Sequence, residues 1–290
     1  MPRRDPRTHP NVRAFDREAA RYERARPDYP VAGVRALAAA LRLRCGTTVV
    51  ELGSGTGKFT RALAPFGAAR LAIEPAPGMR RVFRATVPDV PVLDGTAEAI
   101  PLPDGFADAV VAAQAFHWFR TGPALREIAR VLRPGGRLGL VWNVRDPSAG
   151  WSRRLTQLID RYRGTAPGSG DRAWVPAFAA PDAPFGPLRH RAFRHGHRGP
   201  PELFVDRVLS VSTIAVLPAA ERRRVARKVR AILATDPATR GRSIVTMPYR
   251  TDVYWARRNR RPAARPAGRV TRGRRTRAPS GTGRTSQGTE

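Results

Sequence analysis

Residues 49–60, VVELGSGTGKFT, constrain the fold of this chain more than any other segment. The apolar run at 49–52 is typical of a buried strand, glycines follow at positions 53, 55 and 57, and a helix-compatible run begins at Phe59. An α/β protein uses a strand, a glycine turn and a helix in this order to bring bare backbone and a helix N-terminus up to a nucleotide-like ligand. The segment therefore predicts an α/β fold, and the spacing of its glycines indicates the ligand.

That spacing disfavours two common nucleotide loops. The dinucleotide fingerprint G-x-G-x-x-G needs a glycine where Lys58 stands, so an NAD-dependent oxidoreductase is a weaker alternative. The phosphate-binding loop G-x-x-x-x-G-K-[ST] needs a glycine at Leu52 and a hydroxyl at Phe59, so it is a near miss. The pattern that remains is G-x-G-x-G directly after the acidic residue Glu51 and its neighbour.

Glu74 ends a second apolar run, residues 71–74, roughly twenty residues beyond the glycines. In nucleotide-binding α/β folds a carboxylate at this place accepts hydrogen bonds from the ribose hydroxyls. The alternative is a solvated glutamate at a strand end. Together with the glycine turn, the spacing favours the ribose contact.

Two later segments continue the pattern. Residues 94–101, DGTAEAIP, precede an apolar run at 106–111 that is typical of another strand. Residues 127–138, EIARVLRPGGRL, join a helix with one apolar face to a Pro-Gly-Gly turn and a further strand. Alternation of strands and helices predicts a mainly parallel sheet.

These four segments resemble, in order, the motifs of the class I S-adenosylmethionine (SAM)-dependent methyltransferases, in particular the methyltransferase type 11 and trans-aconitate methyltransferase-like small-molecule subgroup. The resemblance covers about a third of the chain by motif. It implies a Rossmann-like, mostly parallel seven-stranded sheet with helices on both faces and SAM as cofactor. The residues that it assigns to the cofactor are Glu51, Gly53, Ser54, Gly55, Thr56, Gly57, Glu74, Thr96, Ala97 and Gln114.

One assigned position departs from the family. Members often carry Asp where Thr96 stands, to meet the adenine amino group. The side-chain contact is therefore in doubt here, and the backbone at Ala97 is the remaining candidate.

Composition places the chain in a reducing compartment without a membrane anchor. The single cysteine, Cys45, excludes an internal disulfide. Arginines interrupt every apolar stretch, and no apolar segment follows the basic N-terminus, so neither a membrane span nor a signal peptide is expected. We expect a cytoplasmic protein with no membrane partner.

The formal net charge of +30 raises the possibility of nucleic-acid binding. Eleven arginines fall within residues 257–284, so the densest charge lies in a tail. Few aromatic residues stand among the basic ones, and stacking on nucleic-acid bases requires them. A nucleic-acid partner is thus possible but not favoured.

The chain divides into four parts on these signals. Residues 164–187 within it, rich in Gly, Pro and Ala, are expected to form a loop or lid. The tail has almost no large apolar residue and is expected to be disordered. The parts are an N-terminal helical cap (1–45), the SAM-binding Rossmann-like core (46–145), the C-terminal part of the same domain with helical and strand additions (146–255) and the Arg-rich tail (256–290).

Acceptor chemistry is expected at the end of the fourth strand, because ligands bind beyond the carboxyl ends of parallel strands. His117 is the candidate general base or hydrogen-bond donor there, and Trp118 is a candidate substrate contact. The alternative for His117 is packing between its aromatic neighbours. A base is needed only for an acceptor that must lose a proton, and a carboxylate needs none.

The N-terminal segment supplies two more candidates. In the subgroup that the chain resembles, this region folds over the cofactor, which implies that Tyr22 lies near the methyl donor and Arg26 meets a carboxylate. The alternatives are helix packing for Tyr22 and a surface position for Arg26. Histidines at 190, 195 and 197 stand among arginines, which repel a cation, so no metal site is expected.

The sequence therefore predicts a SAM-dependent methyltransferase that acts on a small-molecule acceptor by in-line transfer. O-methylation of a carboxylate or hydroxyl is favoured. The alternative is a nucleic-acid-associated protein or RNA methyltransferase that uses the basic tail.

Overall fold

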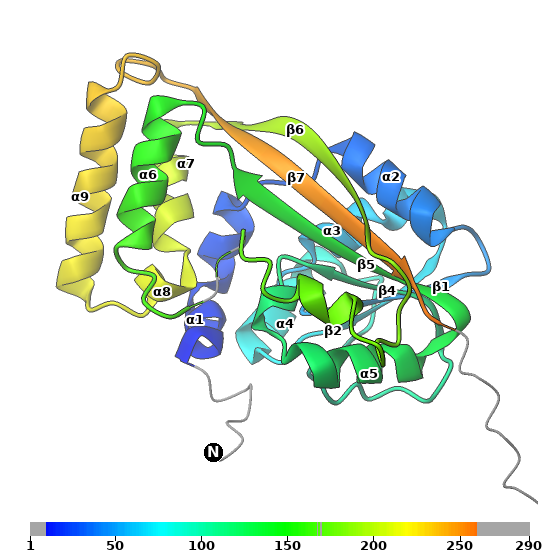
Figure 1. Cartoon of the computed structure of the whole chain (residues 1–290). Coiled ribbons are helices and arrows are strands. Elements are labelled where there is room, and N and C mark those ends of the chain that lie inside the picture. The colour runs from blue at the N-terminus through cyan, green and yellow to red at the C-terminus, as the bar shows by residue number, and fades with distance from the viewer. Residues whose placement is uncertain (1–9, 167, 169, 260–290) are drawn as a thin grey trace, which may run out of the picture. The chain divides into compact units, whose positions relative to one another are not determined.

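The computed structural model describes residues 10–166, 168 and 170–259. A single seven-stranded sheet, with the order β3-β2-β1-β4-β5-β7-β6, runs through them (Figure 1). Strands β1 to β5 are parallel to one another, and β7 is antiparallel to both β5 and β6. The strands are β1 (Thr48–Leu52), β2 (Ala69–Ile73), β3 (Val92–Leu93), β4 (Ala107–Ala113), β5 (Leu132–Arg145), β6 (Arg189–Gly199) and β7 (Val245–Arg257).

Helices follow most strands, as the alternation of sequence patterns predicts. Short 3₁₀ segments stand at η2 (Ala64–Phe66), η3 (Phe116–Trp118) and η4 (Val175–Phe178). The α-helices of the described residues are α1 (Pro10–Ala25), α2 (Val31–Leu41), α3 (Lys58–Ala62), α4 (Pro77–Thr86), α5 (Thr121–Val131), α6 (Gly150–Asp160), α7 (Pro201–Leu209), α8 (Ser212–Ala215) and α9 (Ala219–Thr235).

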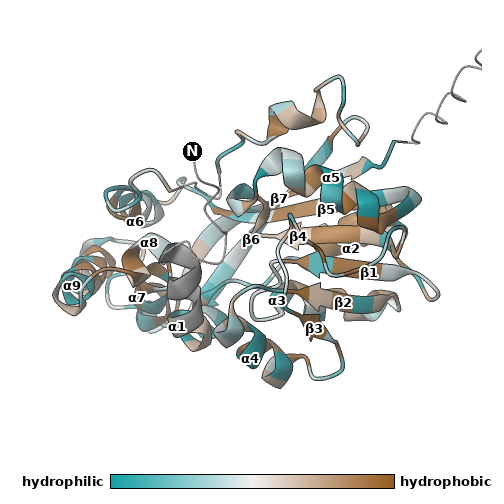
Figure 2. Cartoon of the chain, turned by 90° about the horizontal axis from the view of Figure 1, so that it is seen from below, coloured by the Kyte–Doolittle hydropathy of each residue, from teal (hydrophilic) through white to brown (hydrophobic). Residues whose placement is uncertain are grey.

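Helices cover both faces of the central strands. Successive residues of a strand point to opposite faces, so Val110 packs with α5 residues such as Ile128, while Val111 packs with α2 residues such as Leu37. Apolar residues accordingly concentrate in the central strands (Figure 2). A strand that is buried on both faces reads as a continuous apolar run, which is what residues 109–113 show. The expected Rossmann-like fold is confirmed.

A second apolar cluster surrounds the beginning of β7. Trp151 of α6, Phe204 of α7 and Val225 of α9 pack there with Tyr249 of the strand. Trp151 and Phe204 meet edge to face, with ring centroids 5.3 Å apart. This cluster fixes α7 beside the sheet, next to α1.

Two segments differ from the sequence expectations. Strand β7 continues to Arg257, two residues into the range assigned to the tail, because Ala256 and Arg257 pair with β5. Residues 260–290 of that tail lie outside the described residues. The Gly- and Pro-rich segment 164–187 is not only a loop, since Trp174, Phe178 and Phe185 pack into the core on the α5 face.

Gly57 is a position where the fold requires glycine for two reasons. Its φ is +88°, and a Cβ there would lie 2.6 Å from Cγ2 of Val87 and 2.9 Å from Cδ2 of Phe83. Gly46 has a similar φ of +82° but open space around it. We expect Gly46→Ala to cost about 1–2 kcal/mol of stability from the left-handed backbone alone. Gly57→Ala should cost about 1–3 kcal/mol more, from overpacking.

Urea denaturation of the two variants and the wild type measures this difference. Equal losses for the two alanine variants would mean that helix α4 moves to make room without cost.

Candidate functional site

The glycine turn after β1 leaves an opening beside its backbone. Gly53 and Gly55 both have positive φ, +63° and +56°. A Cβ at Gly53 would lie 2.7 Å from Cβ of Ala115, so this glycine permits close packing against the end of β4. A Cβ at Gly55 would meet no atom within 4 Å. Gly55 therefore leaves room for a ligand atom to approach the main chain.

A cleft lies over this turn, at the carboxyl ends of β1 and β4, where parallel sheets bind their ligands. We call it the cofactor cleft. It brings together the sequence candidates Tyr22, Arg26, Glu51, Ser54 and Gln114, together with the turn. Its lining comprises Tyr22, Arg26, Pro27, Tyr29, Glu51, Gly53, Ser54, Gly55, Thr56, Lys58, Phe59, Ala113, Gln114 and Arg207.

The cleft offers hydrogen-bonding groups that the protein itself does not use. Ser54 Oγ and Thr56 Oγ1 are buried, and neither has a partner within the described part of the chain. Buried hydroxyls normally find a hydrogen-bond partner, and leaving one unmet costs free energy. The two hydroxyls thus fit a polar ligand such as SAM, which would satisfy them.

Glu51 lines the cleft, and its buried carboxyl group has a raised pKa. The residue is 3% exposed, and burial raises its pKa to about 8, although a hydrogen bond from the Thr60 hydroxyl acts in the opposite direction. The nearby carboxylate of Glu74 also raises this pKa. A cationic group in the cleft would favour the ionised form. SAM carries two such groups, a sulfonium and an ammonium.

Glu74 fastens the glycine turn to the end of β2. Its Oε2 accepts a hydrogen bond from the Gly55 N–H (2.8 Å) and its Oε1 accepts one from the Ala76 N–H (2.9 Å). Burial nevertheless raises the pKa of this carboxyl. Each carboxylate oxygen has a second lone pair for a ribose hydroxyl, so the ribose contact stays a prediction for a residue that also has a backbone role.

Several sequence candidates lie outside the cleft lining. Gly57 caps α3 and packs against α4. Thr96 forms an isolated β-bridge with Ala99, and Ala97 is buried in the core beside it. The adenine contacts assigned to Thr96 and Ala97 stay predictions.

Gln114 shows backbone strain at the end of β4. It has a φ of +59°, which a residue with a side chain rarely adopts. Its backbone N–H donates to the Val141 carbonyl (2.8 Å), and its side-chain amide donates to the Asn143 carbonyl (3.2 Å). Strained positions of this kind cluster at functional sites.

His117 is held as a neutral imidazole in one tautomer. The indole N–H of Trp142 donates to Nδ1 of His117 over 3.0 Å. An indole nitrogen only donates, so Nδ1 must be the acceptor and Nε2 must carry the proton. Burial, and after it the charge of Arg26, lower the pKa of His117 to about 4. His117 also packs beside Trp118, with ring centroids 5.3 Å apart.

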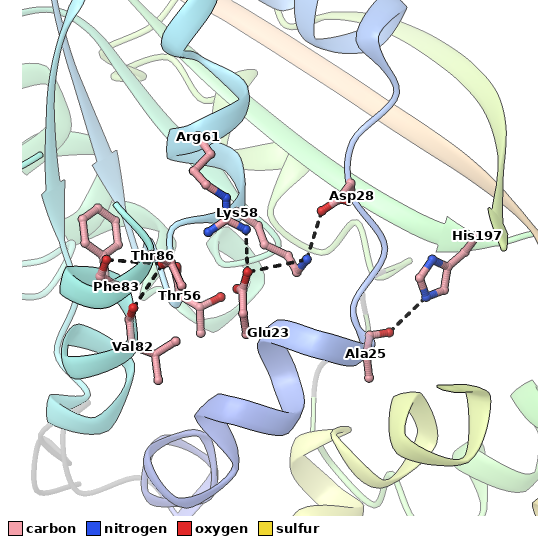
Figure 3. A network of polar contacts seen from close by, with 10 residues as sticks. All are labelled: Glu23, Ala25, Asp28, Thr56, Lys58, Arg61, Val82, Phe83, Thr86 and His197. Carbon is pink, nitrogen blue, oxygen red and sulfur yellow. Dashed lines mark hydrogen bonds and ion pairs between the residues drawn. The ribbon is translucent and has the colours of Figure 1, made fainter. Parts of the chain in front are cut away.

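Ion pairs hold the end of α1 over the glycine turn (Figure 3). Glu23 contacts Arg61 and lies 3.8 Å from Nζ of Lys58, which also binds Asp28 at 2.9 Å. The His197 ring contacts the Ala25 carbonyl. Lys58, the residue that made the turn resemble a phosphate-binding loop, is thus engaged by the N-terminal cap.

Six residues of the cleft lining were not among the sequence candidates: Pro27, Tyr29, Lys58, Phe59, Ala113 and Arg207. Tyr29 and Phe59 meet edge to face at 4.8 Å and form one wall. Arg207 projects from α7 and is 5% exposed. The sequence does contain one sign of this role for Arg207, because a cation stands there on a helix face that Phe204 and Val208 otherwise make apolar.

The histidines of β6 do not converge. His190 binds Asp252 at 2.9 Å, the His195 ring lies tilted against Tyr249 with centroids 5.7 Å apart, and His197 contacts the end of α1. No group of three or more potential metal ligands occurs among the described residues.

Comparison with known proteins identifies the family to which this chain is similar. Residues 50–140 match a family model described as a methyltransferase domain. An uncharacterized methyltransferase of Mycobacterium tuberculosis is 40% identical over 238 residues, which cover 82% of this chain and 93% of that protein. An uncharacterized methyltransferase-like protein of Schizosaccharomyces pombe is 36% identical over 84% of this chain and 95% of its own length.

The fold is shared with solved structures. A protein of Anaeromyxobacter dehalogenans described as a type II methyltransferase superposes with a TM-score of 0.57 at 24% identity, over 82% of this chain and 99% of that one. None of these similarities favours the nucleic-acid alternative. Of the helices that the structure describes, none is long and apolar enough to cross a membrane.

Glu51 should give the ligand-free protein a characteristic pH dependence. Its pKa is raised from 4.5 to about 8 in the fold, so the folded chain keeps a proton that the unfolded chain releases within this window. The free energy of unfolding therefore falls as pH rises from 5 to 8. Glu51→Gln should remove this contribution and gain stability over the wild type across that range, as measured by urea denaturation.

Glu202→Gln is the control, because Glu202 is an exposed carboxylate paired with Arg230. It should show no such gain. A difference between Glu51→Gln and the wild type that stays constant from pH 5 to 8 would contradict the protonated state of Glu51.

The ion pairs of Glu23 should support cofactor binding. Glu23→Gln removes the charge that holds Lys58 and Arg61 and should weaken binding of S-adenosylhomocysteine about 2–5-fold in calorimetry, the range expected for a partly exposed pair. Asp89→Asn breaks the Arg70–Asp89 pair, whose residues do not line the cleft, and should leave the affinity unchanged. Equal affinities of Glu23→Gln and the wild type would show that the cap closes without these contacts.

Proposed function

This chain belongs to the family of SAM-dependent methyltransferases, and we propose that it methylates a carboxylate of a small-molecule acid to give a methyl ester. A hydroxyl acceptor is the second choice. The observation that carries the proposal is the state of His117, the polar side chain expected to serve the acceptor.

His117 is unsuited to remove a proton from a hydroxyl. Its Nδ1 is occupied by the Trp142 N–H, and its pKa is lowered to about 4. A hydroxyl acceptor needs a base whose pKa lies near the working pH. A carboxylate is already ionised at neutral pH and needs no base. The Nε2–H of His117 instead suits a hydrogen bond to the carboxylate oxygen that is not methylated.

Methyl transfer to a carboxylate requires no proton transfer. Bound SAM supplies a methyl group activated by its sulfonium charge. The acceptor oxygen forms a bond to the methyl carbon, the carbon–sulfur bond breaks, and its electron pair stays on sulfur. The protein then needs only to position the acceptor in line and exclude water, which can supply a large part of the rate.

The residues in and around the cofactor cleft have separate tasks in this proposal, and two of them, Glu74 and Trp118, lie outside the cleft lining. Ser54, Thr56 and the glycine turn hold SAM, with Glu51 facing its cationic part and Glu74 its ribose. Tyr22 covers the methyl donor. Arg26 and Trp118 contact the acceptor, and Arg26 Nε lies buried with no partner in the described structure.

An acceptor screen tests the function. After calorimetry with SAM, S-adenosylhomocysteine and NAD, small carboxylic acids and the matching alcohols are compared by release of S-adenosylhomocysteine. We expect turnover with acids and a kcat/KM that is flat above about pH 5, where the carboxylate is ionised. His117→Phe should lower kcat/KM about 10–100-fold through loss of one hydrogen bond to a charged group, without changing the pH profile.

His190→Asn is the matched control, since His190 lies on the edge strand and contacts Asp252. It should retain the wild-type rate. The carboxylate proposal would be overturned by two results together. Alcohols would be the better acceptors, and kcat/KM would rise with pH in the wild type but not in His117→Phe.

A further inference from the structure

Three arginines from separate elements lie close together at one side of the cofactor cleft. Arg26 follows α1, Arg145 ends β5, and Arg207 lies on α7; we call them the arginine cluster. Arg26 and Arg207 line the cleft. Arg145 lies opposite Tyr249 in the β5–β7 pair.

Neutral groups hold the cluster in place. Arg207 Nε donates to the Tyr249 hydroxyl (3.2 Å), and Arg26 Nη2 donates to the Ser210 carbonyl (2.9 Å). Arg145 Nε donates to Thr156 Oγ1 (3.1 Å). These contacts fix the side chains but neutralise none of their charge.

No carboxylate in the described part of the chain forms an ion pair with the arginine cluster. The contrast is Arg21 on α1, which pairs with Glu18 and Asp206. A buried cation normally has a partner of opposite charge, because removing it from water is costly. Here the fold instead places like charges together.

The electrostatic cost is visible in the pKa values. Burial lowers the pKa of Arg26 to about 10, and the charge of Arg207 is the next cause. The pKa of Arg145 is likewise lowered to about 10 by burial and then by Arg207. Both remain charged at neutral pH, and although the charge of Asp160 acts on Arg145, no carboxylate of the described residues pairs with the cluster.

Two donors of the cluster are free for a ligand. Arg26 Nε and Arg207 Nη1 are buried and have no hydrogen-bond partner within the described residues. Arg207 itself is 5% exposed. Donors that are buried, charged and unpaired at the wall of a cleft are what an oxyanion requires.

We propose that the arginine cluster is an anion subsite for the acceptor, which carries a second oxyanion group besides the carboxylate that is methylated. The inference rests on the proposed function and names its substrate class. The reason is charge balance. SAM brings a sulfonium, an ammonium and one carboxylate, and is itself a net cation, so its binding adds no net negative charge to the cleft. A second carboxylate or a phosphate on the acceptor would supply negative charge to the arginine cluster.

Paired acceptors test the subsite. Butyrate and succinate have equal carbon counts and differ in one carboxylate, and 3-phosphonopropionate carries a phosphonate in its place. We expect both dianions to have a lower KM than butyrate. Arg207→Met should raise KM for the dianions about 10–100-fold, and by much more than it raises KM for butyrate, and Arg207→Lys should restore part of the loss. A preference between succinate and the phosphonate identifies the second group.

Arg222→Met is the control, because Arg222 pairs with Glu18 outside the cleft lining and should leave the acceptor preference unchanged. A second measurement excludes the cofactor carboxylate as the ligand. Binding of S-adenosylhomocysteine is compared with that of 5′-methylthioadenosine, which lacks the amino-acid part. If Arg207→Met weakens only S-adenosylhomocysteine and not the dianions, the cluster serves the cofactor and the proposal is overturned.

Thermal shifts separate the subsite from the reaction. Stabilisation by succinate or 3-phosphonopropionate that Arg207→Met abolishes, without any methyl transfer, supports the subsite and refutes the proposed function. Methyl transfer to monocarboxylates and dianions with equal KM supports the function and overturns the subsite.

Discussion

The hydrogen bond from the Gly55 N–H to the Glu74 carboxylate is the contact on which the site depends. It joins the turn after β1 to the end of β2, and the register of these parallel strands places the two residues side by side. The turn needs positive φ at each of its glycines, so it has little intrinsic preference for this shape and must be held. With the turn fixed, the buried hydroxyls of Ser54 and Thr56 face one cleft.

The cleft is completed by chain segments that are far apart in sequence. Arg26 and Ser210 are separated by 184 residues and share a hydrogen bond. The cluster of α6, α7 and α9 around β7 holds α7 in position, and α1 packs against both α4 and α7. The N-terminal cap and the C-terminal additions thus contribute one wall each, while the central sheet supplies the floor. Of the charged lining residues, Glu51 lies on β1 and Lys58 on α3, whereas Arg26 and Arg207 lie on the α1 and α7 side.

Local patterns were predictable from sequence because their causes are local. The glycine turn and the strand ending at Glu74 follow from residue type and spacing. The arginine cluster was not predictable, since only tertiary packing brings Arg207 to Arg26. The tautomer of His117 depends on Trp142, which lies 25 residues away on the next strand. Trp174 and Phe178 lie in a segment whose Gly, Pro and Ala content indicated a loop, but their large apolar surfaces pack into the core.

Part of the positive charge of the chain lies on the edge strand of the sheet, where it has a different role. Strand β6 pairs with β7 on one side, and no strand of the described residues pairs with its other side. Arg189, Arg191, Arg194 and Arg198 are all exposed along it. A long unpaired strand is a template on which another chain can add, and charged side chains oppose such addition. The arginines of β6 therefore act as a barrier against sheet extension, a use of charge that protects solubility and requires no nucleic acid.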